Sequence, residues 1–123
     1  MTVAQRKIIA VIDDDSQMLG ALTRLLRTAG FDVQAFATAG AFLGGDAINK
    51  ADCLVLDVGL TEMSGIELAQ RLNADRSQIP IIFVTGLNTE ELRAEAMNTG
   101  CIAYLRKPFP ASQLLNAIER AIP

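Results

Sequence analysis

Five side chains in the sequence combine into a set that suits phosphoryl chemistry. Each stands at or just after the end of a short apolar or strand-like run: Asp13, Asp14, Asp57, Thr85 and Lys107. Carboxylates gathered in one place need a cation, and oxygen donors without His or Cys favour Mg²⁺. A Lys ammonium and a Thr hydroxyl suit the oxygens of a phosphoryl group. Because phosphoryl transfer depends on positioning and charge neutralisation, the set indicates a carboxylate that accepts a phosphoryl group.

The elements that must position these side chains alternate along the chain. Segments with helical spacing of apolar residues separate the strand-like runs, although 39–45 allows only a short helix bounded by glycines. Continuous apolar strands that alternate with helices predict an α/β fold, with a parallel sheet covered on both faces. Ligands of such sheets bind at the carboxyl ends of the strands, so we expect the polar set in one crevice. The five expected strands are 8–12, 32–36, 53–57, 81–84 and 103–107.

Capping residues mark where the longer helices begin. Asp15, the third acid of VIDDDSQM, is interpreted as the N-cap of the first helix rather than as a metal ligand. Ser64 and Glu67 have the spacing of a capping box, and Pro110 predicts the start of the last helix. Asn88 is interpreted as another helix start, and the charged helix that follows it is expected to be poorly buried.

Composition excludes several classes of function. The 123 residues are half hydrophobic and carry a net charge of −3, which fits one domain with a substantial core, spanning 1–123 with no output domain. Because the chain has no His, it lacks a Ser-His or Cys-His nucleophile and any His metal ligand. No Lys/Arg cluster is present to bind nucleic acid. Cys53 and Cys101 lie in apolar surroundings and are interpreted as buried thiols in a reducing cytosol. No apolar stretch is long enough to span a bilayer, so a cytoplasmic protein is expected.

Four stretches together resemble a response-regulator receiver domain of bacterial two-component signalling. They are IDDD, LVLDVGLTEMSGIEL, IPIIFVTG and AYLRKPF, and the likeness runs from Lys7 to Ala121. The wording of DVGLTEMSGIEL and FVTG is similar to that of receivers from nitrogen-fixation-type transcription regulators. The resemblance implies a doubly wound, flavodoxin-like (βα)₅ fold with strand order 2-1-3-4-5.

The resemblance also implies roles for the acidic residues. Asp57 is then the phosphorylated nucleophile. Asp14 is a direct Mg²⁺ ligand together with Asp57, and Asp13 supports the ion through water. The backbone carbonyl of Gly59 is the remaining protein ligand. Glu62, five residues after Asp57, is interpreted as a solvated loop charge.

Further roles follow for the residues at the ends of the last two strands. Lys107 and Thr85 are implied to hold the phosphoryl oxygens, and Tyr104 to move inward with Thr85 when the domain is phosphorylated. The Lys107–Pro108 peptide bond is implied to be cis. The chain departs from the family at Thr61, where Pro is usual, so the loop after Asp57 lacks a conformational restraint.

The predicted function is that of a phosphorylation-activated switch rather than a conventional enzyme. A histidine kinase or phosphotransfer protein supplies the phosphoryl group, because the partner must bring the His that this chain lacks. The expected output face comprises the helix near 90–99, the strand 103–107 and the last helix. This face is expected to bind a second copy of the chain or an output domain. DNA contact, if any, requires another domain.

Three other functions are weighed against this prediction. A phosphorylation-independent pseudo-receiver typically loses a site residue, whereas all are retained here. An FMN carrier of the same topology needs a phosphate loop, which is missing. A hydrolytic phosphatase usually has a second acid two residues after its Asp nucleophile, where this chain has Gly59.

Overall fold

A five-stranded parallel sheet forms the middle layer of the protein. The computed structural model describes residues 5–87 and 89–123. In the sheet the strands follow the order β2-β1-β3-β4-β5, and every neighbouring pair is parallel. This arrangement confirms the predicted fold class and strand order. The strands are β1 (Ile8–Ile12), β2 (Asp32–Phe36), β3 (Cys53–Asp57), β4 (Ile81–Thr85) and β5 (Ala103–Arg106).

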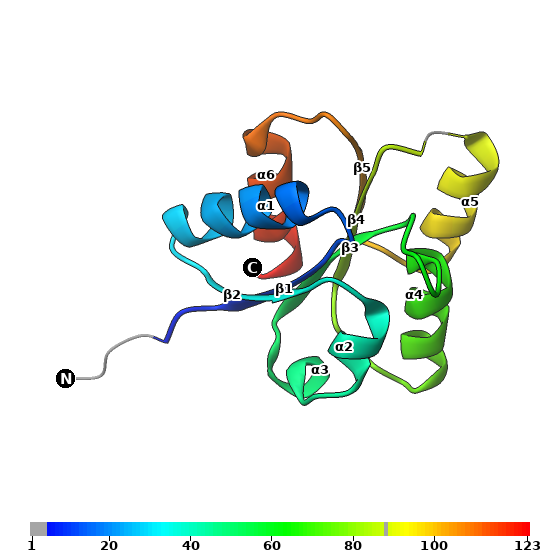
Figure 1. Ribbon diagram of the computed structural model, residues 1–123, viewed down its shortest axis with the longest axis horizontal. Coiled ribbons are helices and arrows are strands. Elements are labelled where there is room, and N and C mark those ends of the chain that lie inside the picture. Colours follow the sequence, from blue (N-terminus) through cyan, green and yellow to red (C-terminus); the bar gives the residue numbers. More distant parts are fainter. Residues whose placement is uncertain (1–4, 88) are drawn as a thin grey trace.

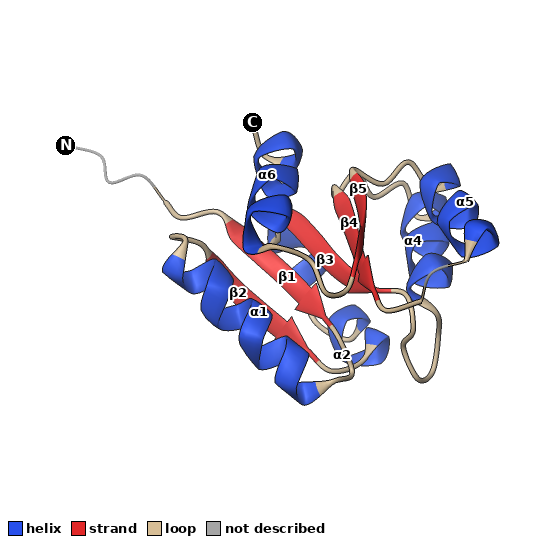
Figure 2. Ribbon diagram, turned by 90° about the horizontal axis from the view of Figure 1, so that it is seen from above, coloured by secondary structure: helices blue, strands red, loops and turns tan. Residues whose placement is uncertain are grey.

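Helices cover both faces of this sheet (Figures 1 and 2). The helices are α1 (Ser16–Thr28), α2 (Ala39–Leu43), α3 (Ala47–Lys50), α4 (Gly65–Ala74), α5 (Glu90–Asn98) and α6 (Ala111–Ala121). Helices α1 and α6 pack on one face, and α2 to α5 pack on the other. The prediction of five helices was wrong because it missed α3. This helix is a single turn in which only Ala47 is buried, so it leaves no periodic apolar pattern in the sequence.

Alternating side chains of each central strand feed two separate cores. Ile9 and Val11 of β1 face the α1 and α6 side, whereas Ala10 and Ile12 face the opposite side. All the residues of β3 and β4 are buried, which explains why both strands read as continuous apolar runs. Strand β2 lies at an edge of the sheet and is partly exposed, as its mixed sequence suggests.

The helix starts agree with the sequence in part. Asp15 caps α1, because its Oδ1 accepts hydrogen bonds from the backbone of Gln17 and Met18. Ser64 Oγ accepts from the Glu67 backbone at 3.0 Å. Pro110 occupies the N-cap position, so α6 begins one residue later than predicted. The predicted start of α5 at Asn88 lies outside the described residues, and the N-cap of this helix is Thr89. Helix α5 is poorly buried, as expected, since Ala96 is its only buried residue.

Two boundaries and one thiol differ from expectation. Strand β5 ends at Arg106, so Lys107 is the first residue after it. Strand β4 extends one residue further than predicted, to Thr85. Cys53 is buried, but Cys101 is only half-buried because it lies in the turn between α5 and β5. Among the described residues, no helix has the length and apolar character needed to cross a bilayer.

Candidate functional site

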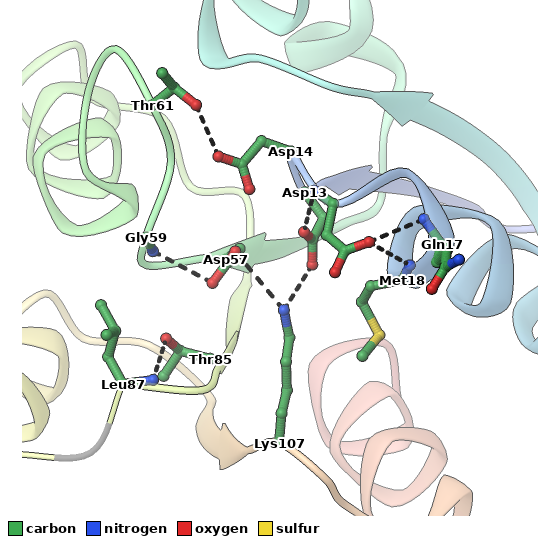
Figure 3. A network of polar contacts seen from close by, with 11 residues as sticks. Asp13, Asp14, Gln17, Met18, Asp57, Gly59, Thr61, Thr85, Leu87 and Lys107 are labelled. Carbon is green, nitrogen blue, oxygen red and sulfur yellow. Dashed lines mark hydrogen bonds and ion pairs between the residues drawn. The ribbon is translucent and has the colours of Figure 1, made fainter.

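The carboxyl ends of four adjacent strands bring the predicted polar residues together. Asp13 follows β1, Asp57 ends β3, Thr85 ends β4 and Lys107 follows β5. Because these strands are parallel neighbours, their carboxyl ends lie at one edge of the sheet. Figure 3 shows the side chains of Asp13, Asp57 and Lys107 directed toward one another.

Three carboxylates form a compact group at this edge. One ligand oxygen from each of Asp13, Asp14 and Asp57 lies within 4.8 Å of the others. Asp13 is fully buried and Asp57 is 7% exposed, whereas Asp14 is exposed. The group has oxygen donors only and one side open to solvent, which is the donor chemistry that suits Mg²⁺.

The Lys107 ammonium neutralises part of this charge. Its Nζ lies 2.8 Å from Asp13 Oδ2 and 3.6 Å from Asp57 Oδ2, and its side chain is 16% exposed. Three carboxylates against one ammonium leave two negative charges unmatched when all are ionised. A divalent cation matches that excess, so the residues present fit the ion that the sequence predicted.

Burial raises the pKa of the Asp57 carboxyl. The Lys107 ammonium opposes this shift and the Asp13 carboxylate adds to it, while the Gly59 N–H stabilises the charged form from 3.2 Å. The charged form of Asp57 is therefore disfavoured by its surroundings, and a bound cation would favour it.

Thr85 and Tyr104 are both hydrogen-bonded to the backbone of Leu87. Thr85 Oγ1 accepts from Leu87 N at 3.1 Å, and the Tyr104 hydroxyl donates to Leu87 O at 2.9 Å. Since a hydroxyl both donates and accepts, the proton of Thr85 remains free to donate to another group. The Tyr104 ring contacts Phe83, with 6.4 Å between ring centroids, and the Arg93 guanidinium lies 6.0 Å from its centroid.

Two features between the end of β3 and the start of α4 were not anticipated from the sequence. A Cβ at Gly65 would collide with the Asp57 carbonyl oxygen, so only glycine fits against the end of β3 there. The Thr61 hydroxyl donates to Asp14 at 2.8 Å. The sequence marks Thr61 as a departure from the family, but it reveals neither of these contacts.

The surroundings of the polar group are apolar on one side. A groove beside Lys107 is lined by Met18, Leu22 and Leu25 of α1 and by Pro108 and Phe109. The Lys107–Pro108 peptide bond is cis. A larger hollow lies at the opposite edge of the sheet, near α3 and the end of α4, and contains none of the predicted site residues.

Comparisons with known proteins agree with this geometry. Residues 9–119 match the response regulator receiver domain family. The chain is 38% identical over 118 residues to the response regulator protein TmoT of Ectopseudomonas mendocina, covering 96% of this chain and 54% of that protein. It is 42% identical over 114 residues to the transcriptional regulatory protein FixJ of Bradyrhizobium diazoefficiens, covering 93% and 56%.

A solved structure gives the same result for the fold. The CheY-like receiver domain protein of Methanospirillum hungatei superposes with a TM-score of 0.86 at 31% identity, covering 94% of this chain and 93% of that one. The chain spans about half the length of the curated relatives it matches.

Proposed function

Because this chain belongs to the response regulator receiver domain family, we propose that it is a phosphorylation-activated switch whose acceptor is Asp57. Receiver domains of response regulators are signalling modules that interact with histidine kinases and output domains. The observation that carries the proposal is the meeting of Asp57, Lys107 and the Asp13–Asp14 pair at one edge of the sheet.

Asp57 is the group placed to react. One of its carboxylate oxygens attacks the phosphorus of a phosphohistidine on the partner protein, forming an O–P bond as the P–N bond breaks. The imidazole leaves and takes a proton from solvent, and Asp57 becomes an acyl phosphate. Lys107 supplies positive charge to the phosphoryl oxygens, and the free proton of Thr85 supplies a hydrogen bond.

A Mg²⁺ ion fits beside this acceptor. Asp14, Asp57 and the backbone carbonyl of Gly59 would hold it directly, with Asp13 acting through water. When bound, it supplies further neutralisation of the phosphoryl charge.

The contacts of Leu87 suggest how phosphorylation reaches another surface. A phosphoryl group on Asp57 attracts the Thr85 hydroxyl, which then leaves the Leu87 N–H. The Leu87 carbonyl also accepts from Tyr104, so a shift of the Leu87 backbone releases the Tyr104 ring to move inward. The face formed by α5, β5 and α6 changes as a result, and it is the proposed surface for a second copy or an output domain.

The apolar groove beside Lys107 provides the proposed docking position for the phosphoryl donor. It is lined by α1 and by Pro108 and Phe109, the two residues that follow Lys107 in the chain. A donor protein that covers Met18 and Phe109 would bring its phosphohistidine over Asp57. The donor must be a histidine kinase or a phosphotransfer protein, since the chain has no His of its own.

Labelling with acetyl phosphate tests the proposal. The wild-type protein should gain one phosphoryl group, measured by intact mass, only when Mg²⁺ is present. Asp57→Asn should gain none. Asp15→Asn is the matched control, since it removes the neighbouring acid but keeps a good N-cap residue, and it should label like wild type. Equal labelling of Asp57→Asn and wild type would refute the assignment to Asp57, whereas a wild-type chain that binds no Mg²⁺ at millimolar concentration would favour the phosphorylation-independent module.

A further inference from the structure

The hydroxyl of Thr61 is hydrogen-bonded to the side chain of Asp14 across 47 residues of chain. Thr61 Oγ1 lies 2.8 Å from Asp14 Oδ2, and the hydroxyl is the donor because a carboxylate oxygen accepts. Thr61 belongs to the loop between β3 and α4, whereas Asp14 follows β1 (Figure 3). The bond therefore joins the two loops that carry the proposed Mg²⁺ ligands.

Asp14 depends on this bond more than its neighbour Asp13 depends on any one contact. The Asp13 carboxylate is buried and is held by Lys107 and by the backbone N–H of Asp15. Asp14 is exposed, and within residues 5–87 and 89–123 Thr61 supplies its one side-chain hydrogen bond. An exposed carboxylate without such a bond samples several rotamers, so Thr61 selects among them.

The bond also leaves the correct oxygen available. Thr61 occupies Oδ2 of Asp14, and Figure 3 shows the other oxygen directed toward Asp57. Partners of this kind orient metal ligands, and their loss weakens metal binding. We propose that Thr61 is a positioning residue that raises Mg²⁺ affinity by orienting Asp14. This inference rests on the proposed function, since it assumes that Asp14 is a Mg²⁺ ligand.

The loop is also held elsewhere, because Leu60 N donates to Val58 O at 3.1 Å and Leu60 and Met63 pack against the core. Gly59 N donates to Asp57 at the start, and Ser64 caps α4 at the end. Thr61 lies between these points, so its hydroxyl also restrains the segment that carries the Gly59 carbonyl. A Pro at this position restrains the backbone but offers no hydroxyl. Thr61 therefore replaces the backbone restraint of Pro with a hydrogen bond to Asp14, the proposed Mg²⁺ ligand.

Calorimetric titration of Mg²⁺ into the purified chain tests the inference. Thr61→Val keeps the shape of the side chain and removes the donor, so we expect its Kd for Mg²⁺ to rise about tenfold, the lower end for such partners because this pair is exposed. Thr61→Ser keeps the donor and should stay within about twofold of wild type. In acetyl phosphate labelling, Thr61→Val should need more Mg²⁺ for half-maximal rate but should reach the wild-type rate at saturating Mg²⁺.

Ser64→Ala is the matched control, because it removes a hydroxyl from the same loop without touching Asp14. It should lower the Tm and leave the Mg²⁺ affinity unchanged. Equal affinities for wild type and Thr61→Val, or equal weakening by Val and Ser, would overturn the role of Thr61 while leaving the proposed function in place. A wild-type chain that binds no Mg²⁺ at millimolar concentration would overturn both.

Discussion

Lys107 makes its shorter ion pair with Asp13 rather than with the proposed acceptor. Its Nζ lies 2.8 Å from Asp13 Oδ2 and 3.6 Å from Asp57 Oδ2. Asp13 has no exposed surface, so this pair is shielded from water and weakly screened by salt. The same ammonium therefore stabilises a buried acid and is the group that we propose to bind the phosphoryl oxygens.

Replacing Lys107 should expose the cost of gathering these acids. Lys107→Met keeps the length of the side chain but leaves Asp13 and Asp57 without their cation. We expect the free energy of unfolding without Mg²⁺ to fall by about 3 kcal/mol, the lower end for breaking a buried pair, measured by urea denaturation. Lys50→Met is the control, since the Lys50–Asp46 pair is exposed and its loss should cost less than about 0.5 kcal/mol. Equal effects of the two substitutions would contradict the structural role of the Lys107 pair.

Mg²⁺ should stabilise the domain through the acids that it neutralises. A ligand that binds only the folded state raises the free energy of unfolding by about 2.7 kcal/mol when its concentration is one hundred times the Kd. The Tm should therefore keep rising as the Mg²⁺ concentration passes the Kd. Asp14→Asn should lose most of this increase, because it removes a proposed ligand. Asp15→Asn should keep it, since Asp15 caps α1 instead. A Tm that does not change with Mg²⁺ in the wild-type chain would count against the metal site.

How much of this could be predicted from the sequence depends on the distance over which each contact acts. The strand ends could be predicted to within one residue, because buried parallel strands appear as apolar runs and their last residues are then fixed in space. The choice of Asp13 as the nearer partner of Lys107 could not, since it depends on distances between residues 94 apart. The Thr61–Asp14 bond was missed for the same reason. Helix α3 was missed because one turn leaves too short a pattern.

Gly65 should not tolerate a side chain. A Cβ would collide with the Asp57 carbonyl oxygen, and neither can rotate away, because the backbone fixes the position of a Cβ and the carbonyl is itself backbone. We expect Gly65→Ala to lower the free energy of unfolding by about 2 kcal/mol, in the range for overpacking, measured by the denaturant midpoint. Gly45→Ala is the control, because a Cβ there meets nothing within 4 Å and should be neutral or slightly stabilising. Similar losses at the two positions would show that general loss of glycine, not this contact, is responsible.

The thiol of Cys53 should make the domain less stable at high pH. Burial raises the pKa of Cys53 from 9.0 to about 12, so the folded chain keeps this proton while the unfolded chain loses it above pH 9. The unfolded state then binds fewer protons than the folded state, and stability falls as pH rises from 9 toward 12. The slope from this group approaches about 1.4 kcal/mol per pH unit.

Comparison with Cys53→Ala isolates that slope from other groups that titrate in the same range. The variant should be less stable than wild type at pH 7, because it leaves a small cavity in the core that contains Val55 and Ile82. The difference should narrow between pH 9 and pH 11, since only wild type loses the contribution of the neutral thiol. Urea denaturation of both chains at several pH values measures this difference in the free energy of unfolding. Parallel stability curves for the two chains across this window would mean that Cys53 is not held as the buried neutral thiol described here.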